Sequence, residues 1–131
     1  MRKIYNKKIL LCKISNLIFN KKISFSTDID ENLQVGLINY DINHVIQAHY
    51  HPKIKRVINN TSEVLILLRG SIQIVLYDEN RKIFKKIKLK SPKIINLYGH
   101  GHKIKILTKK TNIIEIKQGP YVDKKDKILI K

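Results

Sequence analysis

The chain has 131 residues, the size of one domain, and its single cysteine, Cys12, excludes an internal disulfide. Its formal net charge is +17, a balance that favours anionic partners such as nucleic acids or phosphorylated small molecules. Lysine outnumbers arginine 23 to 4, and isoleucine (25) and asparagine (11) are abundant. All three abundant residues use A/T-rich codons, so a codon bias also explains the charge. A solvated lysine surface is therefore favoured over a nucleic-acid surface.

The first 32 residues are predicted to form strands or an extension of the domain. Residues 8–17 fit a strand or a short helix, and strands are favoured. The apolar stretch that begins at Ile9 follows basic residues, as in a signal peptide, but Lys13 and Asn16 interrupt it. No segment reaches the roughly 18 apolar residues of a membrane span. We therefore expect a cytoplasmic protein with no membrane partner. Cys12 lies in the apolar stretch and is expected to be buried.

Residues 33–128 are predicted to form one β domain, which makes the whole chain a single domain. Short apolar or alternating runs are separated by turn residues at the spacing of an all-β sandwich or barrel. In the basic run, Ile87 and Leu89 are expected to face inward, and Lys86, Lys88 and Lys90 outward. The expected strands cover residues 33–40, 45–51, 63–68, 72–77, 81–90, 94–97, 104–107 and 112–117.

Three histidines and one glutamate are candidate metal ligands. His49 and His51 are two positions apart, so on a strand they point to the same face. Glu63 opens an apolar strand, where a carboxylate is costly to bury unless it is paired or bound to metal. His102 has the strand parity of Ile104, on a face expected to point inward. Imidazole and carboxylate ligands of this kind suit a divalent transition metal: iron, manganese, nickel or zinc.

These residues resemble the two signature motifs of the cupin superfamily. The likeness lies in His49-x-His51, in Glu63 followed after six residues by Gly70, and in Gly99-x2-His102. It implies a small double-stranded β-helix, or jelly-roll barrel, with His49, His51, Glu63 and His102 as metal ligands and Gly70 at the turn between the motifs. Two features depart from the pattern. Eleven residues lie between His51 and Glu63, where cupins usually have three or four, and Leu97 replaces a common proline.

The segment from Ile114 to Tyr121 is similar to the end of small bacterial cupins related to the WbuC family, whose genes often lie in surface-polysaccharide clusters. Glu115 and Lys117 share one strand face, and either form an exposed ion pair or contact substrate at the barrel mouth. Other candidate groups are Arg56 and Arg69 as anion contacts, and Tyr98, His100 or Tyr121 as proton carriers.

The resemblance and the ligand set lead to a metal-dependent enzyme that acts on a small sugar or sugar-phosphate substrate. The first hypothesis is an isomerase or epimerase in surface-polysaccharide biosynthesis, working through a metal-stabilised enediolate. An Fe(II)-dependent dioxygenase and a non-catalytic sugar-binding module are the alternatives. A nucleic-acid binder, motivated by charge alone, is disfavoured because the chain has only nine Phe and Tyr and no Trp for base stacking. A homodimer is a further expectation, since small barrels must cover their sheet edges.

Overall fold

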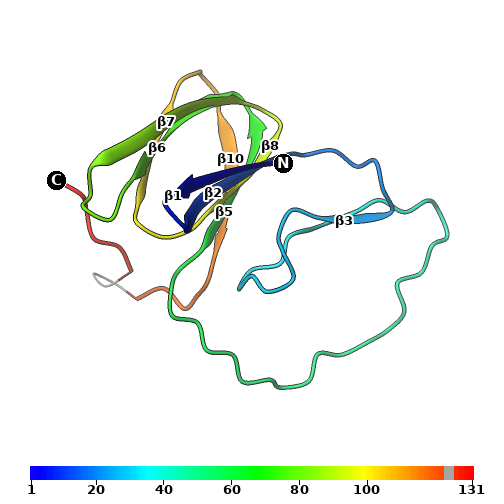
Figure 1. Cartoon of the computed structure of the whole chain (residues 1–131). Helices are drawn as coiled ribbons and strands as arrows, with labels where there is room; N and C mark the ends of the chain where they lie inside the picture. Colours follow the sequence, from blue (N-terminus) through cyan, green and yellow to red (C-terminus); the bar gives the residue numbers. More distant parts are fainter. Residues whose placement is uncertain (123–125) are drawn as a thin grey trace.

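The computed structural model describes residues 1–122 and 126–131, and these residues form an all-β protein without a helix. Two antiparallel sheets pack face to face, and a small hairpin lies beside them (Figure 1). The prediction of an all-β fold is therefore confirmed. Among the described strands none is shared between the two large sheets, so the fold is a sandwich with open edges and not a closed barrel. No helix among the described residues is long and apolar enough to cross a bilayer.

The larger sheet has five strands in the order β1-β2-β8-β5-β10. Its first two strands come from the N-terminal segment, where strands were favoured over a helix, and that prediction is confirmed. The bounds are β1 Arg2–Asn6, β2 Ile9–Asn16, β5 Glu63–Arg69, β8 Lys93–Leu97 and β10 Asn112–Lys117.

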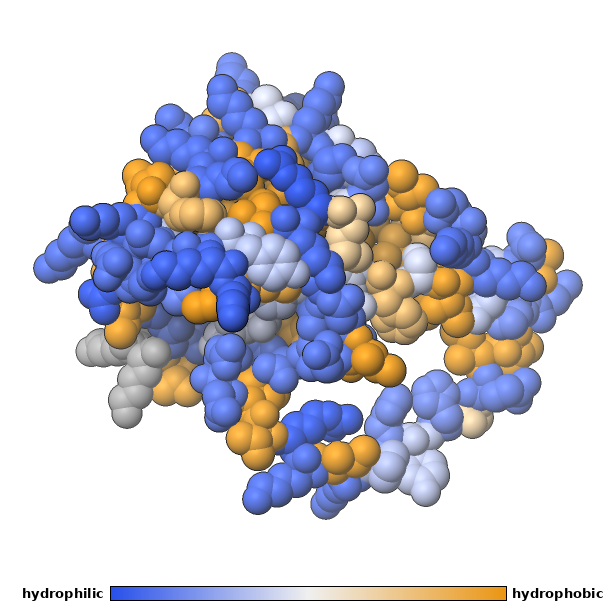
Figure 2. Space-filling model, in the orientation of Figure 1, coloured by the Kyte–Doolittle hydropathy of each residue, from blue (hydrophilic) through white to orange (hydrophobic). Residues whose placement is uncertain are grey.

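The smaller sheet has three strands in the order β7-β6-β9, and the separate hairpin pairs β3 with β4. In β7, Ile87 is buried and Leu89 packs against the core, while Lys86, Lys88 and Lys90 are exposed, as predicted. Figure 2 shows hydrophilic side chains over much of the molecular face in view. The bounds are β3 Ile23–Phe25, β4 Gly36–Ile38, β6 Ser71–Tyr77, β7 Ile83–Lys90 and β9 His102–Ile106.

The main core lies between the two large sheets. It is built from alternate aliphatic residues of both sheets, including Leu65 and Leu67 of β5 and Ile72 and Ile74 of β6, with Cys12 fully buried among them. Burial raises the pKa of the Cys12 thiol to about 12. Cys12 is thus a structural residue, as expected, and the alternation that defines the core also decides which side chains at the strand ends point inward.

Gly70 makes the tight connection between β5 and β6. Its φ of +92° lies in the region that favours glycine, and a Cβ atom there would come within 2.4 Å of the Thr111 hydroxyl oxygen and 2.8 Å of the Thr108 hydroxyl oxygen. Both conditions require glycine at this position. The turn expected at Gly70 is therefore present, and it joins a strand of one sheet to a strand of the other.

A long segment without regular structure connects β4 to β5. We call residues 39–62 the arm; positions 41–60 are all exposed. The predicted strand over residues 45–51 is wrong for this structure, because the arm pairs with no sheet. The expected strand over residues 33–40 is shortened to β4. Period-two apolar patterning creates a strand only when an edge is available to pair with it, and the arm stands off from the sandwich (Figures 1 and 2).

The outer face of the five-stranded sheet carries a charged network. Lys13 of β2 is 1% exposed, and its ammonium group binds the carboxylates of Asp28 and Glu31 from the connection between β3 and β4. The Tyr98 hydroxyl donates to Glu31 from beyond the end of β8. Burial lowers the pKa of Lys13, but the hydrogen bonds to the two carboxylates outweigh it, and the pKa is raised. This network holds the connection against the sheet.

Candidate metal and substrate site

Glu63 and His102 meet at one end of the sandwich. The Glu63 Oε2 atom lies 3.0 Å from the His102 Nε2 atom, and both side chains are partly buried, at 22% and 26% exposure. Glu63 opens β5 in the larger sheet and His102 opens β9 in the smaller sheet. The structure thus brings together two of the four predicted metal ligands, 39 positions apart in the chain.

Strand alternation explains why these two side chains converge. Glu63 has the parity of Leu65 and Leu67, both of which are in the main core. His102 has the parity of Ile104, which packs against the same core, as the sequence predicted. Each residue therefore continues the inward face of its strand to the open end of the sandwich, where the core gives way to polar side chains.

Two further charges lie next to this pair. Lys117 is the register partner of Glu63 across β10 and β5, and its ammonium group binds the Asp126 carboxylate. The hydrogen bond with His102 lowers the pKa of Glu63; burial opposes this, and the charge of Lys117 supports it. The hydrogen bond with Asp126 raises the pKa of Lys117. Glu63 is thus held as a carboxylate at neutral pH, the form that binds cations.

The lowered pKa of Glu63 predicts an acid-dependent loss of stability. A carboxyl whose folded pKa lies below its ordinary value of 4.5 stabilises the native state above that pH, and the contribution is lost as the pH falls through the folded value. We expect the metal-free Glu63→Gln variant to lose less free energy of unfolding than the wild type on acidification from about pH 6 to about pH 3. Urea denaturation at the two pH values measures this difference.

Glu115→Gln is the control for that comparison, since Glu115 is exposed and is in no ion pair among the described residues. This variant is expected to follow the wild type. An equal acid-induced loss of stability in Glu63→Gln and the wild type would contradict the role assigned to the Glu63–His102 pair.

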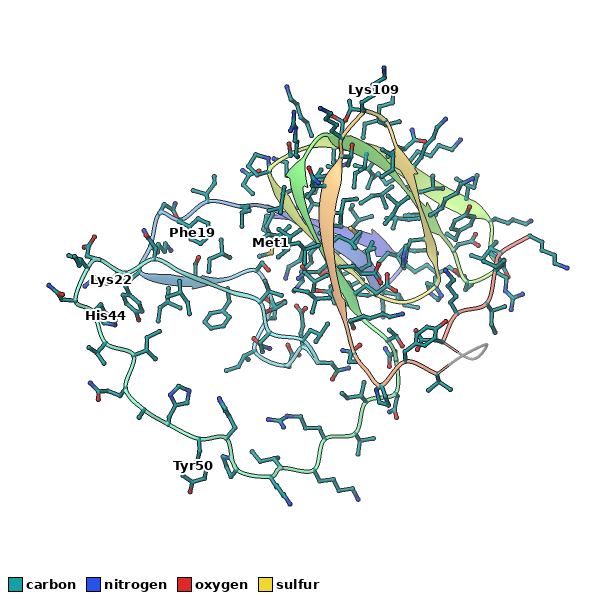
Figure 3. All side chains as sticks on the ribbon, turned by 180° about the vertical axis from the view of Figure 1, so that it is seen from behind. Met1, Phe19, Lys22, His44, Tyr50 and Lys109 are labelled. Carbon is teal, nitrogen blue, oxygen red and sulfur yellow. The ribbon has the colours of Figure 1, made fainter. Side chains whose placement is uncertain are left out.

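His49 and His51 lie on the arm, and both are exposed. Figure 3 shows Tyr50, the residue between them, on the outer loop of the arm, away from the sandwich. The His49 ring is hydrogen-bonded locally, with its Nδ1 atom 2.8 Å from the Gln47 carbonyl oxygen, and it stacks edge-on against His51. The structure therefore does not bring these two predicted ligands to Glu63 and His102. Among the described residues, no three His, Cys, Asp or Glu side chains are grouped as a metal site.

The three candidate proton carriers have different surroundings. Tyr121 lies beside the site, with the Lys117 ammonium 5.3 Å from the centre of its ring. Tyr98 faces the outer network, where burial and the hydrogen bond to Glu31 raise its pKa, so it is poorly suited to proton transfer. His100 follows β8 in a left-handed turn, with φ of 71°, and its Nε2 atom is buried without a partner among the described residues.

The four candidate substrate contacts lie in different parts of the molecule. Glu115 and Lys117 project from the inward face of β10, on the same side as the core residue Ile113, and only Lys117 reaches the site. Arg69 ends β5, at the opposite end of the strand from Glu63. Arg56 lies on the arm and lines a cavity of about 420 Å³ with Glu31 and Gln34, which belongs to the outer network and not to the Glu63–His102 pair.

Two residues near the site were not predicted from the sequence, Gln118 and Asp126. Asp126 approaches Lys117 from a segment that forms no strand, so no periodic pattern marks it. Gln118 follows β10 and accepts a hydrogen bond from the Ser62 amide at 2.7 Å, which holds the start of β5. The buried network around Lys13 was also missed, although three of the ten acidic residues fall within positions 28–31 and signal a concentration of charge.

The donor atoms of Glu63 and His102 fit a shared metal ion. Ligand atoms that each lie about 2.1 Å from one metal, in adjacent positions, are about 3.0 to 3.4 Å apart. The observed 3.0 Å separation of Oε2 and Nε2 matches this requirement, and one oxygen and one imidazole nitrogen suit several divalent transition metals. The two donor atoms are thus close enough to ligate one ion, and the same 3.0 Å separation is that of the hydrogen bond between them.

In comparisons with protein-family models, curated proteins and solved structures, nothing matched this chain.

Proposed function

We propose that this protein is a metal-dependent, cupin-like enzyme that acts on a small carbohydrate-type substrate. The observation that carries the proposal is the inward-facing Glu63–His102 pair, whose donor atoms are 3.0 Å apart at the open end of a β-sandwich. In this proposal Glu63 and His102 are the ligands already in place, and His49 and His51 of the arm complete the set. A bound divalent metal supplies Lewis-acid activation of a substrate oxygen.

The free edge of β9 gives the arm a place to bind. β9 is an edge strand of the three-stranded sheet, and its first residue is His102. Residues 45–51 have the apolar and β-branched pattern of a strand that lacks a partner. The eleven residues between His51 and Glu63 can span about 40 Å when extended, so the chain length permits this movement. Pairing along β9 would cover an exposed edge and bring the two histidines toward His102.

Within this proposal the protein groups beside the site have defined tasks. Glu63 remains ionised and can hold a cation or accept a proton from a substrate hydroxyl. Lys117 places a positive charge beside that carboxylate, and Tyr121 lies against Lys117 at the same end of the sandwich. An isomerase or epimerase is the preferred reaction class. Both remove a proton from the carbon next to a carbonyl and return it to the neighbouring or the same carbon, which needs a base and a stabilised oxygen. An Fe(II)-dependent dioxygenase would use the same ligands.

Metal content of the purified protein tests the proposal. We expect about one equivalent of iron, manganese, nickel or zinc in the wild type by elemental mass spectrometry. The His49→Ala/His51→Ala double variant and the His102→Ala variant should each lose most of that metal. His44→Ala is the matched control, because His44 is an exposed arm histidine that stacks on Tyr40. Wild-type protein that is folded and stays empty after each metal is supplied would overturn the proposal.

A non-catalytic sugar-binding module is the second candidate. It is favoured because only two of the four expected ligands lie together, while Tyr50, the residue between the two arm histidines, lies away from the sandwich in Figure 3. Such a module binds its sugar equally well with and without metal and shows no turnover.

A further inference from the structure

A small cavity lies near the Glu63–His102 pair, and most of its described lining residues are polar. Its volume is about 230 Å³, and its lining comes from two segments that meet at this end of the sandwich. Asp126 connects the cavity to the site, because the same carboxylate binds Lys117, the register partner of Glu63. The lining residues are Ile58, Asn59, Asn60, Thr61, Gln118, Gly119, Pro120 and Asp126.

Gln118 supplies a hydrogen-bond donor without a partner at this cavity. Its Oε1 atom accepts the Ser62 amide hydrogen at 2.7 Å, and this bond fixes which end of the side-chain amide is the oxygen. The Nε2 atom must then be the other end, and it is buried without a hydrogen-bond partner among the described residues. A buried donor left unpaired costs free energy. Gln118 lines the cavity, so a turn of its side-chain amide toward a ligand oxygen would pair this donor and gain affinity.

We propose that this cavity binds a neutral, polyhydroxylated ligand of the size of one sugar ring, with Gln118 as a specificity residue. A hydroxyl group both accepts and donates, so neighbouring hydroxyls can accept from Gln118 Nε2 and donate to the Asp126 carboxylate. Among the described residues the lining has a carboxylate and no cationic side chain, which disfavours a phosphate group at this part of the cavity. Its volume is below the roughly 300 to 1,000 Å³ of pockets for drug-sized ligands, which disfavours a sugar nucleotide.

This inference rests on the proposed function in one respect: it takes the Glu63–His102 site as the place where the substrate reacts. It narrows the proposed substrate of that site to a neutral sugar. Binding can be tested without metal, so the two proposals can fail separately. Saturation-transfer difference NMR and calorimetry are applied to the full chain in EDTA, with glucose, galactose, mannose and myo-inositol as probes. Glucose 6-phosphate and UDP-glucose are the charged comparison ligands.

We expect at least one neutral probe to bind more tightly than both charged ligands, and its affinity to fall about tenfold in Gln118→Glu. This change keeps an oxygen for the Ser62 amide and removes the Nε2 donor. Gln47→Glu introduces the same charge on the exposed arm and should bind as the wild type does. If Gln118→Glu is poorly folded by circular dichroism, Thr61→Val replaces it, with a severalfold loss expected.

Three results would overturn the inference. The first is that no neutral probe binds in EDTA. The second is tighter binding of glucose 6-phosphate or UDP-glucose. The third is a Gln118→Glu variant that is folded and binds the neutral probe as tightly as the wild type. If Thr61→Val has been used in its place, unchanged affinity in Thr61→Val has the same meaning. Wild-type protein that stays empty after each metal is supplied, but still binds a neutral sugar in EDTA, would refute the metal proposal and leave this inference standing.

Discussion

Replacement of Lys13 by methionine is expected to lower the free energy of unfolding by about 3 kcal/mol, at the lower end of the range for a broken buried ion pair. Lys13 is 1% exposed, whereas Glu31 is 13% and Asp28 is 53% exposed. Methionine fills much of the same volume but leaves Glu31 poorly solvated without its cation. Asp28 can turn to solvent, which limits the cost. Urea denaturation at neutral pH measures the change.

Lys88→Met is the matched control for this experiment. Lys88 is an exposed residue of β7, and its replacement should change the stability by less than about 0.5 kcal/mol. Adding Glu31→Gln to Lys13→Met should recover part of the loss, because it removes the carboxylate left without a cation. A Lys13→Met protein as stable as the wild type would show that apolar packing fully replaces the ion pair, contrary to the role assigned to it.

Metal is expected to protect the arm from trypsin by at least tenfold. The arm carries Lys53, Lys55 and Arg56, all exposed in the structure, so cleavage there is expected to be rapid in EDTA. If His49 and His51 join Glu63 and His102 on one metal ion, the arm is held at both ends and pairs with β9. Mass spectrometry of the fragments over time, with manganese, nickel or zinc against EDTA, measures cleavage at these three sites.

Cleavage after Lys127, which is exposed near the C-terminus, serves as the internal reference for trypsin activity. The ratio of arm cleavage to reference cleavage should fall with metal in the wild type and remain unchanged in the His49→Ala/His51→Ala variant. Equal protection in that double variant would show that metal acts elsewhere on the chain, and an unchanged ratio in the wild type would contradict closure of the arm.

Most strands could be predicted from the sequence, because each central strand carries its own apolar pattern. β5, β6, β8 and β10 begin or end within a residue or two of the expected bounds, and Gly70 occupies the expected turn. Residues 45–51 have a similar pattern and form no strand. The pattern records what a segment can bury, and pairing depends on whether another strand's edge lies within reach.

The candidate site was predicted in part for the same reason. Strand parity placed His102 on an inward face, and Glu63 was selected because a carboxylate that opens an apolar strand is costly to bury. The two side chains meet at one end of the sandwich. Parity has no meaning on an arm without a sheet, so the shared strand face expected for His49 and His51 does not form in this structure. Gln118 and Asp126 could not be found from periodicity, because both lie outside the strands, and tertiary contacts alone bring them to the site.

By itself the sequence determined the all-β class, the inward-facing positions of the basic strand and the burial of Cys12, since these depend on the pattern of neighbouring positions. The tertiary structure decided that Lys13 is a buried cation, that Glu63 and His102 are neighbours, and that the arm lies apart from the sheets. Those outcomes depend on residues far apart in the chain: 15 and 18 positions between Lys13 and its carboxylates and 39 between Glu63 and His102. Local patterns carry no information on which distant groups meet, because packing of the whole chain sets those contacts.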